Sequence, residues 1–171
     1  YLPAICGNAF DDPRLDLVIA DGVDYVAKYE GPGFDLIIID STDPIGPGEV
    51  LFTKDFYTDC KSCLAAGGII VTQNGVPFMQ GEELRGTMQI FESLFDDATC
   101  YLASVPTYVG GPMAFGWGTD NATARHTPID VIARRFDSAG VTTGYYLPEM
   151  HAQAFALPRY VDELVNPPVT R

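Results

Sequence analysis

Basic residues are scarce in this sequence. Lysine and arginine together number 10 among 171 residues, against 23 aspartates and glutamates, so the formal net charge is −13 at pH 7. Nucleic acids and anionic membrane surfaces both require a basic face, so the composition argues against either as a partner. The acidic surplus would suit a cationic substrate, although a solvated acidic surface gives the same composition.

Long apolar runs and targeting signals are also missing. The sequence has no stretch of about 18 apolar residues and no signal-peptide pattern, so nothing in it indicates a membrane protein or secretion. The four cysteines lie in apolar or helical contexts, which favours reduced thiols and a cytoplasmic location. Cys60-x-x-Cys63 falls inside an expected helix rather than at a strand-to-helix turn, so we interpret it as structural rather than redox-active.

Histidine is limited to His126 and His151, which stand far apart without a second ligand at metal-binding spacing. We therefore expect no metal, and a histidine-based triad has little support. With 47% apolar and 19% charged residues, the chain is typical of one soluble globular domain. Residues 1–4 carry no initiator methionine and no start signal for an element, which favours a fragment.

The most informative stretch is a short apolar run followed by two acids. The consecutive apolar residues Leu36 to Ile39 predict a strand buried on both faces, as in a parallel sheet covered by helices. Asp40 ends this strand, and Asp43 follows on a loop stiffened by Pro44 and Pro47. Ligands of open α/β sheets bind at such strand ends, and the Asp-x-x-Asp spacing suits a cationic group. The alternative is that Asp40 is only a turn or N-cap residue.

Other segments extend the same alternation of strands and helices. Residues 15–20 predict a strand that delivers Asp21-Gly22 to the same rim as Asp40 and Asp43, and a helix follows as far as Gly31. The further elements that we expect are a helix from the N-cap Thr53 to about residue 65, a strand over 69–73 ending in Gln73, a helix over 82–95, an antiparallel hairpin over 99–105 and 113–118, and helices over 129–138, 150–155 and 158–165. Tyr108 lies at the mouth of the hairpin, where an ordinary surface aromatic is the alternative.

The stretch Asp40-Ser-Thr-Asp-Pro-Ile-Gly-Pro47 strongly resembles the polyamine aminopropyltransferases, in particular bacterial spermidine synthases. Further segments fall in family order: Asp11-Asp-Pro-Arg14, Asp21-Gly22, Leu51-Phe52, Gly67-Gly-Ile69 with Gln73-Asn74, Pro106-Thr-Tyr108 with Gly110-Gly111, and Ala154-Phe-Ala-Leu-Pro158. The resemblance implies a Rossmann-like, doubly wound α/β sheet of the S-adenosylmethionine methyltransferase type with a C-terminal antiparallel hairpin. It also implies that residues 1–171 are the C-terminal part of a catalytic domain, truncated at its N-terminus.

The implied reaction moves the aminopropyl group of decarboxylated S-adenosylmethionine onto putrescine, which gives spermidine and methylthioadenosine. The cosubstrate is the donor, no further cofactor is expected, and the complete enzyme is expected to be a homodimer. A diamine is protonated at neutral pH and must lose a proton before it can attack, and we expect Asp40 to be the general base. The resemblance assigns the diamine contacts to Asp40, Asp43, Gln73 and Tyr108, and the cosubstrate contacts to Asp21, Gly22, Asp40, Ser41, Pro47 and Leu51.

The family also has an N-terminal β-domain and a glycine-rich loop with acids that hold the ribose and the aminopropyl nitrogen, and this sequence contains neither. We therefore expect the chain by itself to be inactive. Two alternatives stay open: an inactive fragment of such an enzyme, and a class I S-adenosylmethionine-dependent methyltransferase, which the two acids of the 40–47 loop disfavour.

Overall fold

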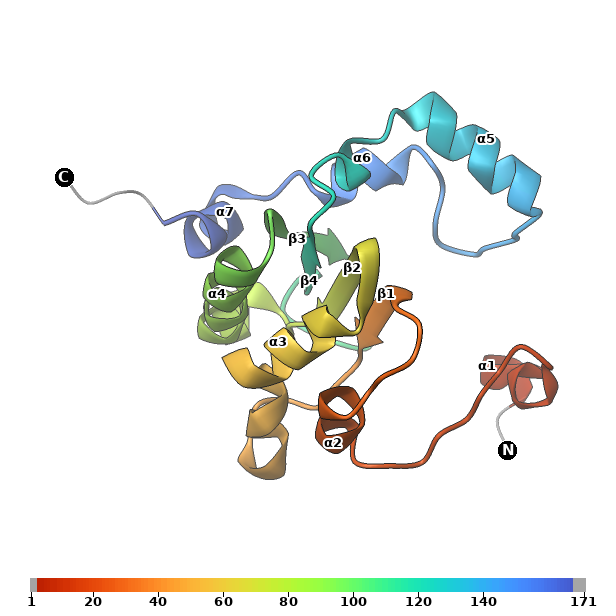
Figure 1. Cartoon of the computed structure of the whole chain (residues 1–171). Coiled ribbons are helices and arrows are strands. Elements are labelled where there is room, and N and C mark those ends of the chain that lie inside the picture. Colours follow the sequence, from red (N-terminus) through yellow and green to blue (C-terminus); the bar gives the residue numbers. More distant parts are fainter. Residues whose placement is uncertain (1–2, 168–171) are drawn as a thin grey trace.

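The computed structural model describes residues 3–167, which fold around a four-stranded mixed sheet of order β1-β2-β4-β3 (Figure 1). The strands are β1 (Phe34–Ile39), β2 (Leu64–Gln73), β3 (Asp97–Ala103) and β4 (Met113–Thr119). Strands β1 and β2 are parallel, whereas β4 is inserted antiparallel between β2 and β3. The expected hairpin therefore closes one end of the sheet.

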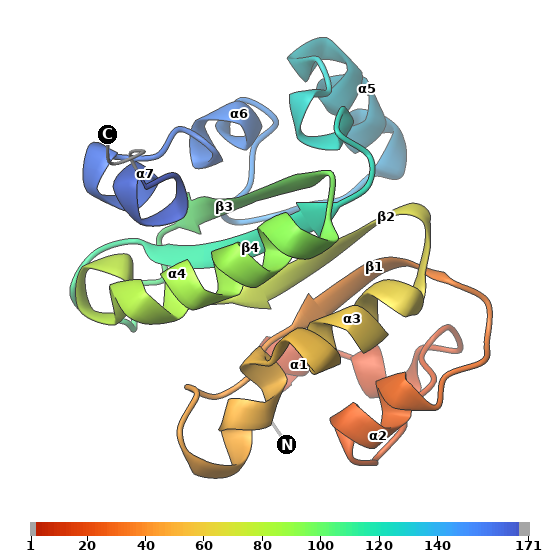
Figure 2. The same cartoon turned by 60° about the vertical axis from the view of Figure 1, so that its left-hand side comes forward.

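Helices lie on both sides of the sheet, which confirms the doubly wound arrangement. In Figure 2, α3 and α4 lie on one side of the strands, and α5 and α6 lie on the other. The α-helices are α1 (Pro3–Cys6), α2 (Gly22–Ala27), α3 (Lys54–Ser62), α4 (Pro77–Leu94), α5 (Ile129–Ala139), α6 (Met150–Ala154) and α7 (Arg159–Val165). Short 3₁₀ segments are η1 (Ala9–Asp11), η2 (Gly46–Phe52) and η3 (Ala124–His126).

The main core lies between the sheet and helices α3, α4 and α7. Leu84, Met88 and Phe91 recur at helical spacing along α4 and are fully buried against it. The ring of Phe91 meets that of Tyr57 from α3 edge-on, with centroids 5.0 Å apart. Burial of each large apolar side chain contributes about 1.5–3 kcal/mol, so this cluster holds α3 and α4 on the sheet.

A smaller aromatic cluster packs α6 onto the opposite face of the sheet. Phe155, which follows α6, lies with its ring centroid 5.6 Å from that of Tyr101 and 5.4 Å from that of Trp117. Tyr101 and Trp117 come from β3 and β4, the two strands of the hairpin. The C-terminal helices are thus anchored on both sides of the hairpin half of the sheet.

Helix α3 begins where its sequence predicts and ends slightly earlier. The Thr53 side chain accepts a hydrogen bond from the N–H of Phe56, which confirms the N-cap. The helix ends at Ser62 rather than near residue 65, because Leu64 already pairs with Phe34 of β1. Gly33 makes this approach possible, since a Cβ there would lie 2.6 Å from the backbone of Ala65.

The strand expected over residues 15–20 is wrong. This segment is extended but pairs with no strand among residues 3–167, and it joins η1 to α2 away from the sheet (Figure 1). Its apolar side chains are exposed, and that of Ile19 is 92% exposed. Alternating apolar residues favour extended backbone, but a strand forms only where a neighbour supplies hydrogen-bond partners.

The expected burial of β1 on both faces is also wrong. Among the described residues β1 pairs only with β2, so it is an edge strand. Ile37 and Ile39 pack against the main core, whereas Leu36 and Ile38 on the opposite face are 50% and 67% exposed. The continuous apolar run therefore identifies a strand correctly but does not show what covers its second face.

Candidate active site

Two polar residues lie side by side at the carboxyl edge of the sheet. Ile39 of β1 pairs with Thr72 of β2, and the chain continues from them to Asp40 and Gln73. Because β1 and β2 are parallel, the two residues leave the sheet at the same edge. This position agrees with the sequence-based expectation for both residues, while their chemical roles remain predictions.

The side chain of Gln73 carries a hydrogen-bond acceptor that no donor meets among the described residues. Its side-chain oxygen Oε1 is buried and has no hydrogen-bond partner within residues 3–167. A buried amide oxygen without a donor is costly, so this oxygen is suited to receive an N–H group from a ligand. An ammonium group supplies such a donor.

The neighbouring Asn74 has a structural role that the sequence did not reveal. It is completely buried, and its Oδ1 accepts hydrogen bonds from the Thr72 hydroxyl at 2.7 Å and from the Gly116 N–H at 3.1 Å. Its Nδ2 donates to Thr87 of α4 at 2.8 Å. This network joins the end of β2 to β4 and α4, and so holds Gln73 in place.

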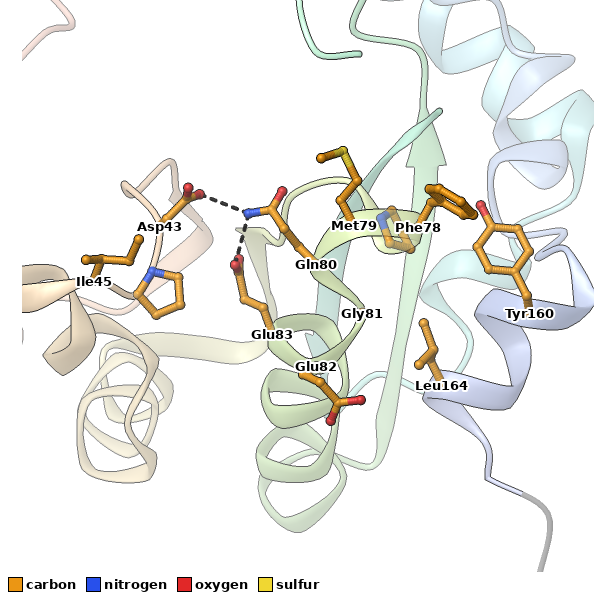
Figure 3. A pocket seen from close by; sticks show the side chains of 12 residues that line it. Asp43, Ile45, Phe78, Met79, Gln80, Gly81, Glu82, Glu83, Tyr160 and Leu164 are labelled. Carbon is orange, nitrogen blue, oxygen red and sulfur yellow. Dashed lines mark hydrogen bonds between the residues drawn. The ribbon is translucent and has the colours of Figure 1, made fainter. Parts of the chain in front are cut away.

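Asp43 is tied to helix α4 by a hydrogen bond (Figure 3). Its Oδ1 accepts from Nε2 of Gln80 at 3.1 Å, and the same Nε2 donates to Oε2 of Glu83 at 3.3 Å. Figure 3 shows the Gln80 amide between the two carboxylates. The two acids come from a loop and a helix far apart in sequence, and a glutamine bridges them.

These three residues line a cavity of about 990 Å³ between the 43–45 loop, the first turns of α4, and α7. The rest of its wall is mainly apolar: Pro44, Ile45, Pro77, Phe78, Met79, Tyr160 and Leu164 (Figure 3). An apolar wall with a few polar groups at one side is the usual composition of a small-molecule site. The sequence did not reveal Gln80 and Glu83 as residues of this site, because residues within a helix give no sign of which loop they face.

Glu83 is a partly buried carboxyl group with an unusual environment. Burial, and next the nearby charge of Asp43, raise its pKa from 4.5 to about 7, and the hydrogen bond from Gln80 opposes this only in part. Its Oε1 is buried without a hydrogen-bond partner in the described part of the chain. The group therefore changes charge near neutral pH, beside the Asp43 loop.

Asp21 lies at the N-terminus of α2 rather than on the sheet edge. Its side chain accepts hydrogen bonds from the N–H groups of Val23 at 2.9 Å and Asp24 at 3.3 Å, so it is the N-cap of α2. It lines a depression of about 380 Å³ beside α2, different from the cavity that Asp43 lines. The expected common rim for Asp21, Asp40 and Asp43 rested on the strand over 15–20, which does not form.

Gly22 is the first residue of α2, and a Cβ there would meet no protein atom within 4 Å. Packing among the described residues therefore does not require a glycine at this position. Close approach of a ligand remains the predicted reason for it. The predicted roles of Asp21 and Gly22 in binding a nucleoside stay predictions.

Tyr108 lies in the connection between β3 and β4 and is 55% exposed. The same connection approaches α4 two residues later, where a Cβ on Gly110 would lie 3.0 Å from the sulfur of Met79. Met79 lines the cavity of Asp43, so the connection runs beside this cavity, although Tyr108 is not among its lining residues.

Three further predicted contacts lie in or before η2. Ser41 is half-buried, Pro47 is exposed in the first turn of η2, and Leu51 packs partly against the main core. Their proposed contacts with a cosubstrate stay predictions. In the described part of the chain, no group of three or more histidine, cysteine or acidic side chains is arranged to hold a metal ion. Residues 3–167 also include no helix that is long and apolar enough to cross a membrane.

The topology and the polar carboxyl edge define a class of protein: a Rossmann-like α/β domain of the methyltransferase type. Comparison of the sequence with known families makes the assignment specific. The chain belongs to the spermine/spermidine synthase family, since residues 1–127 match the family described as "Spermine/spermidine synthase domain". The family and fold that the 40–47 motif predicts are therefore confirmed.

Curated relatives carry the corresponding name. The polyamine aminopropyltransferase of Ruegeria sp. (strain TM1040) is 58% identical over 164 residues, which are 96% of this chain and 57% of the relative. Polyamine aminopropyltransferase 1 of Pseudomonas aeruginosa is 53% identical over 166 residues, which are 97% of this chain and 58% of the relative. The chain thus spans somewhat more than half the length of these relatives.

Solved structures agree with the assignment. A spermidine synthase in complex with the transition state analogue AdoDATO superposes with a TM-score of 0.85 at 32% identity, covering 96% of this chain and 55% of that one. The spermidine synthase from Thermotoga maritima gives a TM-score of 0.80 at 29% identity, covering 96% of this chain and 53% of that one. Similarity at this level supports both the fold and the family.

Proposed function

We propose that this chain carries the diamine-binding and base-bearing part of a spermidine synthase, which transfers the aminopropyl group of decarboxylated S-adenosylmethionine to putrescine. One observation carries the proposal. Asp40 and Gln73 leave parallel neighbouring strands at the same edge, and the second acid Asp43 follows three residues after Asp40. The names of the curated relatives support the same reaction class.

The reaction is a nucleophilic displacement at carbon. A nitrogen lone pair of putrescine attacks the carbon of the aminopropyl group that is bonded to sulfur. The carbon–sulfur bond breaks, its electron pair stays on sulfur, and the positively charged sulfonium becomes the neutral thioether of methylthioadenosine. The leaving group gains no negative charge, so the protein's main task is to deprotonate the amine and hold it in line.

Asp40 is the proposed base that accepts the proton from the attacking nitrogen. An aspartate is a weak base for an alkylamine, so the site must lower the pKa of the amine, or the proton must pass on through Tyr108 or water. Asp43 and the unpartnered Oε1 of Gln73 provide acceptors for the ammonium hydrogens. Tyr108 completes the polar contacts of the diamine in this proposal.

The nucleoside half of the donor is assigned to Asp21, Gly22, Ser41, Pro47 and Leu51 on the family resemblance. Homodimeric assembly and a cytoplasmic location belong to the same proposal. The four cysteines are all free, which fits a reducing compartment.

The test is an aminopropyl transfer assay in which spermidine and methylthioadenosine are measured by mass spectrometry. It should be run on residues 1–171 alone, and on these residues joined to the part of the Ruegeria relative that they do not match. The resemblance predicts transfer by the joined form and none by the chain alone. Methylated product from S-adenosylmethionine, without spermidine, would support a methyltransferase and refute the proposal.

Asp40→Asn in the joined form should lower kcat by about 10²–10⁴-fold, because the amide cannot accept a proton. The matched control is Glu92→Gln, which neutralises an exposed acid on α4. If Asp40→Asn kept most of the activity, Asp40 would not be the base.

A further inference from the structure

One side-chain hydrogen bond joins the loop that carries Asp43 to helix α4. Within residues 3–167, the only side-chain hydrogen bond between residues 41–48 and another part of the chain is the one from Gln80 Nε2 to Asp43 Oδ1. The other hydrogen bonds of this loop are local, such as the one from the Ile45 N–H to the Asp43 carbonyl at 2.7 Å. The position of the Asp43 carboxylate therefore depends on Gln80.

The amide of Gln80 is itself fixed in one orientation. Its Oε1 accepts a hydrogen bond from the N–H of Val76 at 3.1 Å, and its Nε2 donates to the carboxylates of Asp43 and Glu83. A flipped amide would place its NH₂ group against the Val76 N–H and its oxygen against two carboxylates. The network thus permits only the orientation that directs an N–H at Asp43.

The backbone around Gln80 is shaped to allow this contact. Gln80 departs from helical geometry, with φ −121° and ψ 33°, and so kinks α4 after its first turn. Gly75 has a φ of +64°, and a Cβ there would lie 2.3 Å from Gln80 Oε1. A glycine is needed here both for the left-handed backbone and for the space. The turn that follows Gln73 thus leaves room for the Gln80 amide, and the N–H of Val76 binds it.

A glutamine is chemically suited to hold Asp43 without neutralising it. A lysine or arginine in this place would form an ion pair with the carboxylate and cancel its charge. The amide donates one hydrogen bond and leaves the negative charge and the second oxygen of Asp43 free to meet a cationic ligand.

We propose that Gln80 is a positioning residue that holds the Asp43 carboxylate for the amine acceptor, that the Val76 N–H fixes the Gln80 amide, and that Gly75 leaves room for this amide. The role of Asp43 toward an amine rests on the proposed function, whereas the Gln80–Asp43 tether does not. The hydrogen bond between Gln80 and Asp43 connects the ends of β1 and β2. The turn after β2 carries Gln73 and binds Gln80 through the N–H of Val76, and Gln80 in turn binds Asp43, which follows β1.

The test compares Gln80→Leu with Gln89→Leu, which makes the same change at an exposed position further along α4. The first readout is amide hydrogen exchange of residues 41–48 in the chain of residues 1–171, and this measurement needs no enzyme activity. Gln80→Leu should raise exchange in this loop by about 10-fold, and Gln89→Leu should leave it unchanged. Unchanged exchange in Gln80→Leu would overturn the tether.

The second readout is steady-state kinetics of the joined form that contains the matched part of this chain. Gln80→Leu should raise the KM for putrescine by about 10-fold and change the KM for decarboxylated S-adenosylmethionine by less than about 2-fold. Equal effects on both KM values, or none on that of putrescine, would show a purely structural role and overturn the proposal.

Gln80→Asn keeps the amide but shortens its reach, so it should behave like Gln80→Leu. It supplies the same test if the leucine variant does not fold. If the wild-type joined form transfers no aminopropyl group, the proposed function fails, and the exchange measurement still decides whether Gln80 holds the loop.

Discussion

Replacing Glu83 with glutamine should make the free energy of unfolding less dependent on pH. Burial and the charge of Asp43 raise the pKa of Glu83 from 4.5 to about 7 in the folded protein. Between these two values the folded state holds a proton that the unfolded state has released. Stability from this group is therefore fully present below about pH 4.5 and is lost as the pH rises through 7.

The size of the effect follows from the two pKa values. At about 1.4 kcal/mol per pKa unit, the full difference would correspond to roughly 3 kcal/mol. Glu83 is only partly buried, and solvent screening reduces this figure to roughly 1–2 kcal/mol. The ionisable groups near it are Asp43 on the loop and Tyr57 on α3, and burial raises the pKa of Tyr57 to about 12, so this tyrosine stays neutral at these pH values.

The assay is urea unfolding of the wild type, Glu83→Gln and Glu92→Gln at pH 5 and pH 8. Relative to the wild type, Glu83→Gln should gain roughly 1–2 kcal/mol more at pH 8 than at pH 5, because glutamine cannot ionise. The exposed control Glu92→Gln should follow the wild type at both values. If Glu83→Gln kept the pH dependence of the wild type, the inferred environment of Glu83 would be wrong.

Two further predictions concern the scaffold that positions the site. Phe91→Ala should lower the free energy of unfolding by about 3–5 kcal/mol, because it leaves a cavity between α3, α4 and the sheet. The control Phe78→Ala, at a residue 77% exposed, should change it by less than about 1 kcal/mol. Equal losses of the two variants in urea unfolding would contradict the assignment of Phe91 to the core. Asn74→Ala should cost about 2–4 kcal/mol, because Thr87 and the Gly116 N–H lose their buried partner. A loss below about 0.5 kcal/mol in the same assay would show that the network contributes little.

Elements with strong local signals could be predicted well from the sequence. The N-cap at Thr53 and the C-terminal Gly140 of α5, with φ +60°, mark helix ends through local backbone chemistry that few tertiary contacts can override. The buried face of α4 follows from its 3.6-residue period, and the hairpin of β3 and β4 follows from two strand-like segments that a turn with Gly110 and Gly111 separates.

Predictions that depended on neighbouring strands succeeded only in part. Residues 15–20 have a strand-like pattern but no partner within residues 3–167, and β1 has an apolar run whose second face is half exposed. A residue pattern describes what a segment can bury and not whether another segment covers it. The prediction that Asp21 lies beside Asp40 on one edge of the sheet is wrong for this reason.

The sequence by itself determined the family, the position of Asp40 and Gln73 at strand ends, and the Asp-x-x-Asp loop, because these depend on residues close together in the chain. Only the tertiary structure showed that Gln80 and Glu83 face Asp43 and that Asn74 is a buried structural link. Contacts such as that of Gln80 with Asp43 join residues 37 positions apart. They depend on how α4 kinks and packs, which no local pattern encodes.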